Sequence, residues 1–258
     1  MSVTSPVAIV RPPGDSFVRA ISSREQRTEI DPERARAQHE QYRETLGALG
    51  VAVVTLPPNE AHPDSCFTQD LAVVLDRGAL LARSAEPSRR GEEREIEPLI
   101  GERLDRLERT AAPATLEGGD VMRLGRRLIA GRSSRTNEEG ITALRSFAGS
   151  LEFDLGEADV PVGILHLQTG ATAISDGLVI GIRTVLDQPA FANLDRIVVD
   201  EEDLDACNVL AVGRDVVMAT GFPPVRRRIG DRGYSVHEVD LSEFLKADGG
   251  PTCLSLLV

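Results

Sequence analysis

The segment GATAISDGLVIGIR (residues 170–183) contains two short apolar runs that flank the dipeptide Asp176-Gly177. An Asp-Gly pair between two such runs is a strong signal for a tight β-hairpin. Three other segments repeat this strand–turn–strand pattern: DLAVVLDRGALLAR (70–83), GDVMRLGRRLIAGR (119–132) and NVLAVGRDVVMAT (208–220). A fifth segment, TCLSLLV (252–258), supplies one strand only. The sequence therefore predicts an internal repeat built on one kind of hairpin.

The spacing of these units indicates how they are arranged. Their equivalent first residues are Asp70, Asp120, Gly170, Asn208 and Cys253. These positions are 50, 50, 38 and 45 residues apart. The strand that the fifth unit lacks is available in VAIVRP (7–12), and pairing of the two chain ends would close a ring. We therefore predict a single domain, residues 1–258, with a closed, radially repeated α/β assembly of five units rather than a doubly wound sheet.

Helical connections are predicted between the hairpins. Residues 31–49 carry the clearest signals, since Asp31 is a suitable N-cap and the apolar residues that follow have helical spacing. A second helix is expected to begin after the cap Asn137. Residues 91–109 are also expected to be helical, with a proline that begins or kinks the helix. Residues 13–30 are polar and without a clear period, so we expect a mobile loop there that can act as a lid.

The amino-acid composition argues against several classes of function. The chain has 41 acidic and 29 basic residues and a net charge of −12, which argues against a nucleic-acid-binding surface. A cationic small-molecule substrate would suit this charge, although solubility explains it equally well. No apolar run reaches the roughly 20 residues of a membrane-spanning helix. The sequence signals of phosphate-binding loops, dinucleotide sites and zinc sites are absent as well.

Cysteine usage and the amino terminus indicate a cytoplasmic protein. Three cysteines, at positions 66, 207 and 253, cannot build a disulfide framework, and the first two are expected to pack in the interior. The first residues lack the basic and apolar regions of a secretory signal. We therefore expect a reducing, cytoplasmic environment. The sequence leaves the oligomeric state open, and a homodimer is compatible with it.

The hairpin starts also carry the residues with chemical function. In a radial repeat, equivalent positions of different units converge on the central axis, whatever their separation in sequence. The reactive residues at or just before these starts are Asp64, Asp70, Glu117, Asp120, His166 and Cys253. A catalytic cysteine needs a histidine for proton transfer, and a carboxylate can orient the imidazole. Carboxylates around a thiol disfavour the thiolate unless a cation is bound, and the substrate could be that cation.

Each of these residues also has a purely structural interpretation. A free cysteine such as Cys253 usually packs as a small apolar side chain, and His166 could be a hydrogen-bonded core residue of the stretch GILHLQ. The glycines after Glu117 could only shape the entry to a strand, and Asp64 could only form a turn. The coincidence of these residues at matching positions of the repeat favours a catalytic site.

Six further stretches follow one another along nearly the whole chain: PDSCFTQD (63–70), PSRR (87–90), LEGGD (116–120), SSRTN (133–137), LHLQTG (165–170) and GGPTCLSLL (249–257). Together they resemble the dimethylarginine dimethylaminohydrolases, which belong to the guanidine-modifying, or pentein, superfamily. The resemblance implies a five-bladed, pseudo-symmetric α/β-propeller. It also implies a hydrolase that converts Nω-methylated L-arginine to L-citrulline and a methylamine without a metal or an organic cofactor.

The resemblance implies a role for each reactive residue. Cys253 would attack the guanidinium carbon and form a covalent thiouronium intermediate. His166 would protonate the departing amine and then act as base for the incoming water, and Glu117 would lie beside the imidazole. These roles suit the chemistry, because a guanidinium is a resonance-stabilised cation that carboxylates can hold through its N–H groups. The substrate-binding residues implied in the same way are Ile21, Asp64, Gln69, Asp70, Arg89, Arg135, Ala247 and Asp248.

These substrate-binding residues fall into groups. Arg89 and Arg135 match the arginines that hold the substrate carboxylate in the family. Asp64 and Asp70 match acidic residues around the guanidinium. Ile21, Ala247 and Asp248 match positions that contact the α-amino end of the substrate.

Gln69 departs from the family pattern, in which a glutamate precedes the aspartate. The segment FTQD (67–70) is also similar to the FTRD of arginine deiminases. Those enzymes have an aspartate two residues after the catalytic histidine, where this chain has Gln168, and they are much longer. We therefore favour a hydrolase of Nω-methylated arginine. The alternatives are a hydrolase of arginine or another arginine-like guanidine, and a propeller that binds an arginine derivative without turnover.

Overall fold

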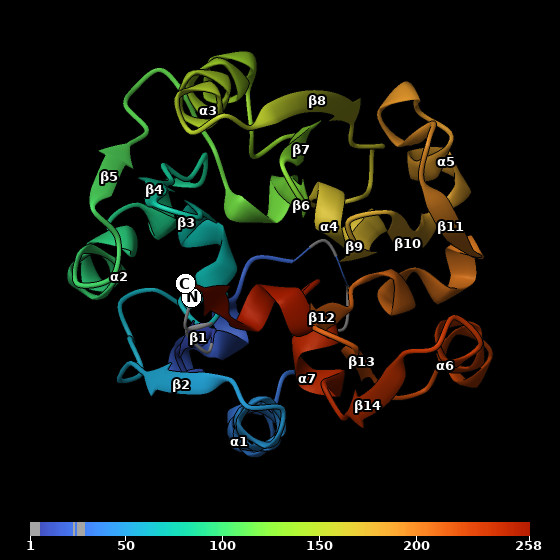
Figure 1. Ribbon diagram of the computed structural model, residues 1–258. Coiled ribbons are helices and arrows are strands. Elements are labelled where there is room, and N and C mark those ends of the chain that lie inside the picture. Colours follow the sequence, from blue (N-terminus) through green and yellow to red (C-terminus); the bar gives the residue numbers. More distant parts are fainter. Residues whose placement is uncertain (1–5, 23, 25–28) are drawn as a thin grey trace.

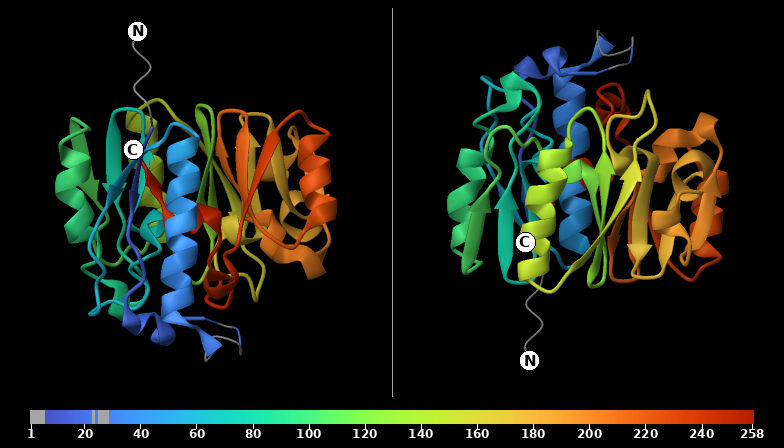
Figure 2. Two further views of the ribbon diagram at one scale, coloured as in Figure 1. Left: turned by 90° about the horizontal axis from the view of Figure 1, so that it is seen from below. Right: turned by 90° about the horizontal axis from the view of Figure 1, so that it is seen from above.

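Five three-stranded sheets form a ring around a central axis in the computed structural model, which describes residues 6–22, 24 and 29–258 (Figure 1). In each sheet two strands pair antiparallel, and the middle strand also pairs parallel with a third, outer strand. Figure 2 shows the two longest helices, residues 32–48 and 138–150, on the outside of this ring. The predicted α/β assembly of five units is confirmed.

The sheets follow one another around the ring in chain order. The first contains β15 (Leu256–Leu257), β1 (Val7–Val10) and β2 (Ala52–Thr55). The second and third contain β3 (Ala72–Leu75), β4 (Gly78–Leu81) and β5 (Arg106–Arg109), and β6 (Val121–Leu124), β7 (Arg127–Arg132) and β8 (Asp154–Asp159). The remaining two contain β9 (Ala171–Ser175), β10 (Leu178–Ile182) and β11 (Asp195–Val199), and β12 (Leu210–Val212), β13 (Asp215–Ala219) and β14 (Ser235–Val239). All four predicted hairpins are present.

The two ends of the chain close the ring. Strand β15 pairs antiparallel with β1, with Leu257 opposite Ala8 and Leu256 opposite Ile9. The backbone N–H of Val7 also donates to the carbonyl of Val258 at 3.1 Å. This pairing completes the fifth unit as the sequence predicts.

Helices connect the middle strand of each sheet to its outer strand. They are α1 (Pro32–Ala48), α2 (Glu93–Gly101), α3 (Glu138–Ser150), α5 (Arg183–Leu186) and α6 (Pro223–Gly230). The predicted caps are confirmed at two of them. The Asp31 carboxylate accepts from the backbone N–H groups of Glu33 and Arg34, and Asn137 accepts from that of Gly140. These bonds satisfy N–H groups that lack a partner within the helix.

The helix predicted over residues 91–109 is only partly correct. Helix α2 ends at Gly101, and residues 106–109 form the outer strand β5, which pairs with β4. Pro98 lies inside α2, where it removes one hydrogen bond of the helix. The strand escapes sequence analysis because its side chains are half-buried or exposed and mostly charged.

The loop predicted over residues 13–30 also needs correction. Residues Asp15–Arg19 form a 3₁₀ helix, η1, which places Phe17 in the interior. The ring of Phe17 lies 5.9 Å from that of Phe67 and 5.3 Å from that of Phe244. A single buried aromatic side chain leaves no periodic pattern in the sequence. Residues 23 and 25–28 of the predicted lid lie outside the described residues.

Apolar side chains fill the spaces between neighbouring sheets and beneath the helices. For example, Leu144 and Phe147 of α3 pack with Leu80 of β4 and Leu128 of β7. Cys66 and Cys207 are fully buried, as predicted. Within the part of the chain that the structure describes, no helix has the length and apolar character needed to cross a membrane.

Candidate active site

A short helical turn precedes the first strand of every sheet. These turns are η3 (Thr68–Leu71), η5 (Gly118–Asp120), α4 (Leu167–Gly170), η7 (Glu201–Cys207) and η8 (Pro251–Leu254). Because the sheets are arranged around one axis, the five turns meet near the centre of the ring (Figure 1). They place Asp70, Glu117, His166 and Cys253 around one site, as the repeat predicts.

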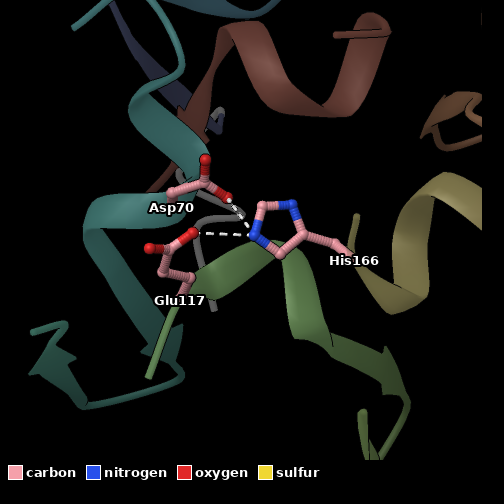
Figure 3. A group of neighbouring side chains, drawn as sticks. All are labelled: Asp70, Glu117 and His166. Carbon is pink, nitrogen blue, oxygen red and sulfur yellow. Dashed lines mark hydrogen bonds and ion pairs between the residues drawn. The ribbon is translucent and has the colours of Figure 1, made fainter. Parts of the chain in front are cut away.

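His166 and Glu117 form a buried ion pair (Figure 3). The Nε2 atom of His166 lies 2.7 Å from Oε2 of Glu117 and 3.9 Å from Oδ1 of Asp70. The three side chains are at most about 6 % exposed. Figure 3 shows the second ring nitrogen, Nδ1, on the side of the imidazole that faces away from both carboxylates. That nitrogen is therefore the one that remains for a substrate.

The electrostatics of this pair favour an imidazolium. Burial opposes the charged form of His166, but Asp70, Asp120 and Glu117 together raise the pKa of His166 to about 9. Burial likewise opposes the Glu117 carboxylate, but the hydrogen bond and charge of His166 hold the pKa of Glu117 well below its usual range. At neutral pH the site therefore holds a protonated histidine, which is a general acid.

Two glycines allow the imidazole and Asp70 to come this close to the backbone. A Cβ atom on Gly119 would lie 2.7 Å from Oδ1 of Asp70 and 2.9 Å from the imidazole of His166. A Cβ atom on Gly118 would lie 2.1 Å from the carbonyl oxygen of Gln69. The backbone N–H of Gly119 also donates to Asp70 at 3.1 Å. The Glu-Gly-Gly-Asp segment is thus required by close packing at the axis.

The Cys253 thiol is buried in the same site. Burial, and then the Asp70 carboxylate, raise the pKa of Cys253 to about 11, although hydrogen bonds from Gly250, Thr252 and Asn208 partly oppose this rise. The thiol is therefore neutral at pH 7 in the absence of a bound cation. A cationic substrate close to Asp70 and Cys253 would favour the thiolate.

A small pocket opens onto these groups. Its lining residues are Ile21, Asp64, Phe67, Asp70, Arg89, Arg135, Leu165, His166, Ala247, Asp248, Gly249 and Cys253. They include every residue that the sequence analysis assigns to the site except Glu117, Gln69 and Asp120. Asp120 lies outside the pocket, where it accepts from the backbone N–H of Leu167 and the hydroxyl of Ser133. Glu117 lies behind His166 and contacts the pocket through it.

Comparisons with known proteins decide the family. A family model described as N,N dimethylarginine dimethylhydrolase, eukaryotic, matches residues 12–188. The N(G),N(G)-dimethylarginine dimethylaminohydrolase of Pseudomonas aeruginosa is 35% identical over 250 residues, which are 96% of this chain and 97% of that protein. This chain belongs to the dimethylarginine dimethylaminohydrolase family. The protein of the same name from Streptomyces coelicolor is 33% identical over 96% of this chain and 95% of its own length.

A solved structure of a dimethylarginine dimethylaminohydrolase has the same fold. The Pseudomonas aeruginosa enzyme in complex with citrulline superposes with a TM-score of 0.94 at 32% identity, over 98% of each chain. The five-bladed propeller implied by the resemblance to this family is therefore confirmed.

Gln69, a predicted substrate-binding residue, is not brought into the pocket with the other family positions. It lines a larger cavity of about 640 Å³ at the opposite side of the inner turns, together with Gln168 and Thr252. Its Nε2 atom donates to Oε1 of Gln168 at 3.2 Å, and Gln168 donates to the carbonyl of Val121 at 2.7 Å. The two glutamines therefore form a polar layer behind the catalytic groups.

The two arginines of the pocket differ in how fully they are engaged. The Arg89 guanidinium bonds to Asp70 at 2.6 Å, to Glu92 and to two backbone carbonyl groups. Among the described residues, Arg135 has ion-pair partners only at 3.6 Å from Glu86 and 3.7 Å from Glu117. Arg135 therefore retains more N–H donors for a ligand than Arg89 does.

Three side chains of the site could in principle hold a cation. Asp70, Glu117 and His166 offer donor atoms that all lie within 4.8 Å of one another. The 2.7 Å separation of Glu117 and His166 is that of a charge-assisted hydrogen bond. The imidazolium thus supplies the positive charge that these carboxylates face.

Sequence analysis does not identify four residues of the site. Phe67, Leu165 and Gly249 line the pocket, and Asn208 contacts the thiol from outside it. A Cβ atom on Gly249 would lie 2.3 Å from the Phe67 ring, so the two positions depend on each other. The available signal for Asn208 was its place at the start of the fourth repeat unit.

Proposed function

We propose that this chain hydrolyses Nω-methylated L-arginine to L-citrulline and a methylamine. The observation that carries the proposal is that the Cys253 thiol and the His166–Glu117 ion pair meet at one pocket that is also lined by aspartates and arginines. Relatives named N(G),N(G)-dimethylarginine dimethylaminohydrolase over nearly the whole chain support it, as does the citrulline complex of one of them.

The pocket has the groups that a guanidinium amino acid requires. Asp64 and Asp70 are about 95 % buried and can pair with the planar N–H groups of the guanidinium. The apolar side chains of Phe67 and Leu165 offer contact surface for N-methyl groups. Arg135 has donors for the substrate carboxylate, with Arg89 beside it. We place the α-amino group near Ile21, Ala247 and Asp248, which line the same pocket.

Cys253 opens the reaction as the nucleophile. The bound guanidinium favours loss of the thiol proton to solvent, and the thiolate sulfur then forms a bond to the guanidinium carbon. The bond from that carbon to the methylated nitrogen breaks, and His166 donates its proton so that a neutral amine leaves. Glu117 stabilises the imidazolium before this step and keeps the ring oriented.

Water completes the reaction. The covalent thiouronium is attacked by water, and neutral His166 accepts the proton of that water. The C–S bond then breaks, the remaining hydroxyl proton passes to the departing sulfur, and the products are the free thiol and the carbonyl group of citrulline. No oxidant or reductant is needed at any step.

Substitution of the catalytic residues tests the proposal. We expect Cys253→Ser and His166→Gly each to lower turnover by at least about 10²-fold, since a nucleophile or a general acid is removed. Cys207→Ala is the matched control, because this buried thiol lies outside the pocket and its loss should leave turnover intact. Binding without citrulline formation, unchanged in Cys253→Ser, would instead indicate a non-catalytic binding protein.

Hydrolysis of arginine itself is the second candidate. Asp64 and Asp70 would pair with an unmethylated guanidinium in the same way. Parallel assays with arginine and asymmetric dimethylarginine separate the two candidates.

We also propose a cytoplasmic enzyme, on the strength of its three free cysteines. A homodimer is compatible with the sequence, and light scattering of the purified protein would measure the oligomeric state.

A further inference from the structure

Asn208 links the turn that carries the nucleophile to the turn that carries the histidine. It follows η7 directly, is 5 % exposed and begins the fourth repeat unit. Its Nδ2 atom donates to the carbonyl of Gln168 at 3.2 Å and to Sγ of Cys253 at 3.5 Å. Its Oδ1 atom accepts from the backbone N–H of Thr252 at 2.9 Å and from the hydroxyl of Thr252 at 3.0 Å.

These partners fix which end of the amide faces the thiol. If the amide were reversed, its NH₂ group would face the N–H of Thr252 and its oxygen would face the carbonyl of Gln168. Both contacts would be repulsive, because they pair donor with donor and acceptor with acceptor. The hydrogen-bond network therefore requires that Asn208 present a donor to Cys253.

A second donor reaches the same sulfur atom. The backbone N–H of Gly250 lies 3.5 Å from Sγ of Cys253. A Cβ atom on Gly250 would lie 2.6 Å from Cγ of Asn208, so only glycine lets the amide come this close. The positions of these two neutral donors therefore depend on each other. The Thr252 hydroxyl lies 3.9 Å from the same sulfur, and it donates to Oδ1 of Asn208.

Comparison of Asn208 with the residues that begin other repeat units shows which of its two polar atoms serves the fold. Oδ1 of Asp70 accepts from Gly119 N–H at 3.1 Å, and Oδ1 of Asp120 accepts from Leu167 N–H at 2.9 Å. In each case a unit's first side chain binds the turn of the next unit, and Oδ1 of Asn208 does the same with Thr252. The Nδ2 donor has no counterpart in these aspartates, so the repeat's architecture does not explain it.

We propose that the Asn208 amide, together with the Gly250 N–H group, forms an uncharged donor cradle that stabilises the thiolate of Cys253 during nucleophilic attack. This inference rests on the proposed function. A lysine or arginine at this place would stabilise the thiolate too, but it would repel the guanidinium of the substrate. A neutral amide avoids that repulsion in a pocket whose carboxylates must bind a cation.

The decisive experiment measures the rate of Cys253 alkylation by iodoacetamide against pH, by mass spectrometry, in the full-length protein. Asn208→Asp keeps the acceptor for Thr252 but replaces the donor with a carboxylate oxygen, whose negative charge also opposes the thiolate. We expect alkylation of this variant at pH 8 to be at least about tenfold slower, and its pH profile to move up by about one unit. Asn208→Ser, which is too short to reach the sulfur, removes the donor without adding a charge, so the proposal requires slower alkylation in this variant as well.

Thr172→Val is the matched control. Thr172 donates to the carbonyl of Cys207 at 2.7 Å and accepts from Val209 N–H at 3.3 Å, so it anchors the same strand entry without contacting the sulfur. Its alkylation profile should match that of the unsubstituted protein. A folded Asn208 variant with an unshifted profile would overturn the proposal. Because alkylation requires no turnover, a shifted profile in a protein that releases no citrulline would refute the proposed function and leave the cradle standing.

Discussion

Gln69 and Asp70 are adjacent in the turn η3, yet their side chains line cavities on opposite sides of the inner turns. Asp70 lines the active-site pocket, whereas Gln69 lines the 640 Å³ cavity behind it and bonds to Gln168. The same division recurs where Thr252 lines the rear cavity and Cys253 the pocket. The inner turns thus present a charged, reactive layer on one side and a neutral polar layer on the other.

This division predicts that Gln69 does not contact the substrate directly. We expect Gln69→Glu to leave the ratio of turnover between methylated and unmethylated arginine within about twofold. It should lower the free energy of unfolding by about 1–3 kcal/mol, because a carboxylate would replace the donor that bonds to Oε1 of Gln168. Assays with both substrates and urea unfolding measure the two effects. A large change in the substrate ratio would instead show that Gln69 contributes to substrate specificity.

Gly119 is predicted to be essential for catalytic geometry. In Gly119→Ala the new methyl group would overlap Asp70 and the His166 imidazole, which must then shift. We expect kcat to fall about 10²-fold, since a misplacement of about 1 Å has a cost of that order. Gly149→Ala is the control, because a Cβ atom at this position in α3 meets nothing within 4 Å. Full activity in Gly119→Ala would show that the imidazole can move without loss.

Tyr42 of α1 is predicted to stabilise the loop that carries the nucleophile. Its buried hydroxyl donates to the carbonyl of Pro251 at 2.8 Å and lies 2.8 Å from Oγ of Ser255. Tyr42→Phe should lower the free energy of unfolding by about 1–2 kcal/mol, because both buried partners lose a hydrogen bond. Tyr234→Phe is a fitting comparison, since among the described residues the Tyr234 hydroxyl has no hydrogen bond; urea unfolding of the two variants should differ clearly. Equal free energies of unfolding for the two variants would show that the Tyr42 hydroxyl does not stabilise this loop.

The raised pKa of His166 predicts a pH-dependent contribution to stability. A group whose pKa is higher in the folded protein stabilises the fold fully below its unfolded value, near 6.5, and this contribution is lost as the pH rises through about 9. Between pH 6.5 and 9 the unsubstituted protein should therefore lose more stability than His166→Gln. Urea unfolding at several pH values measures this difference. Parallel decline in both proteins would mean that His166 is neutral in the folded state.

The sequence predicts the inner part of the ring well and the outer part poorly. The hairpins are apolar and end in recognisable turns, so 70–83 and 170–183 are found directly. The outer strands β5 and β8 are half-exposed and rich in charge, so they lack an apolar pattern and go undetected. The burial of Phe17 is not predicted for a related reason, because a single buried aromatic residue leaves no periodic pattern in the sequence.

The candidate site is predicted as a set of positions but not as a geometry. Repetition alone places Asp70, His166 and Cys253 near one axis, and the pocket confirms that they meet. Repetition cannot tell that Gln69 faces away, because successive side chains in a 3₁₀ turn point in directions about 120° apart. It also cannot show which end of the Asn208 amide faces the thiol, since this depends on partners from two other units.

Citrulline release from asymmetric dimethylarginine, measured beside release from arginine under the same conditions, tests the central claim most directly. We predict citrulline from the methylated substrate, with a matching amount of dimethylamine, and loss of this activity in Cys253→Ser. Citrulline from arginine alone would assign the chain to arginine hydrolysis, and the absence of citrulline from both substrates would contradict a hydrolase of this class.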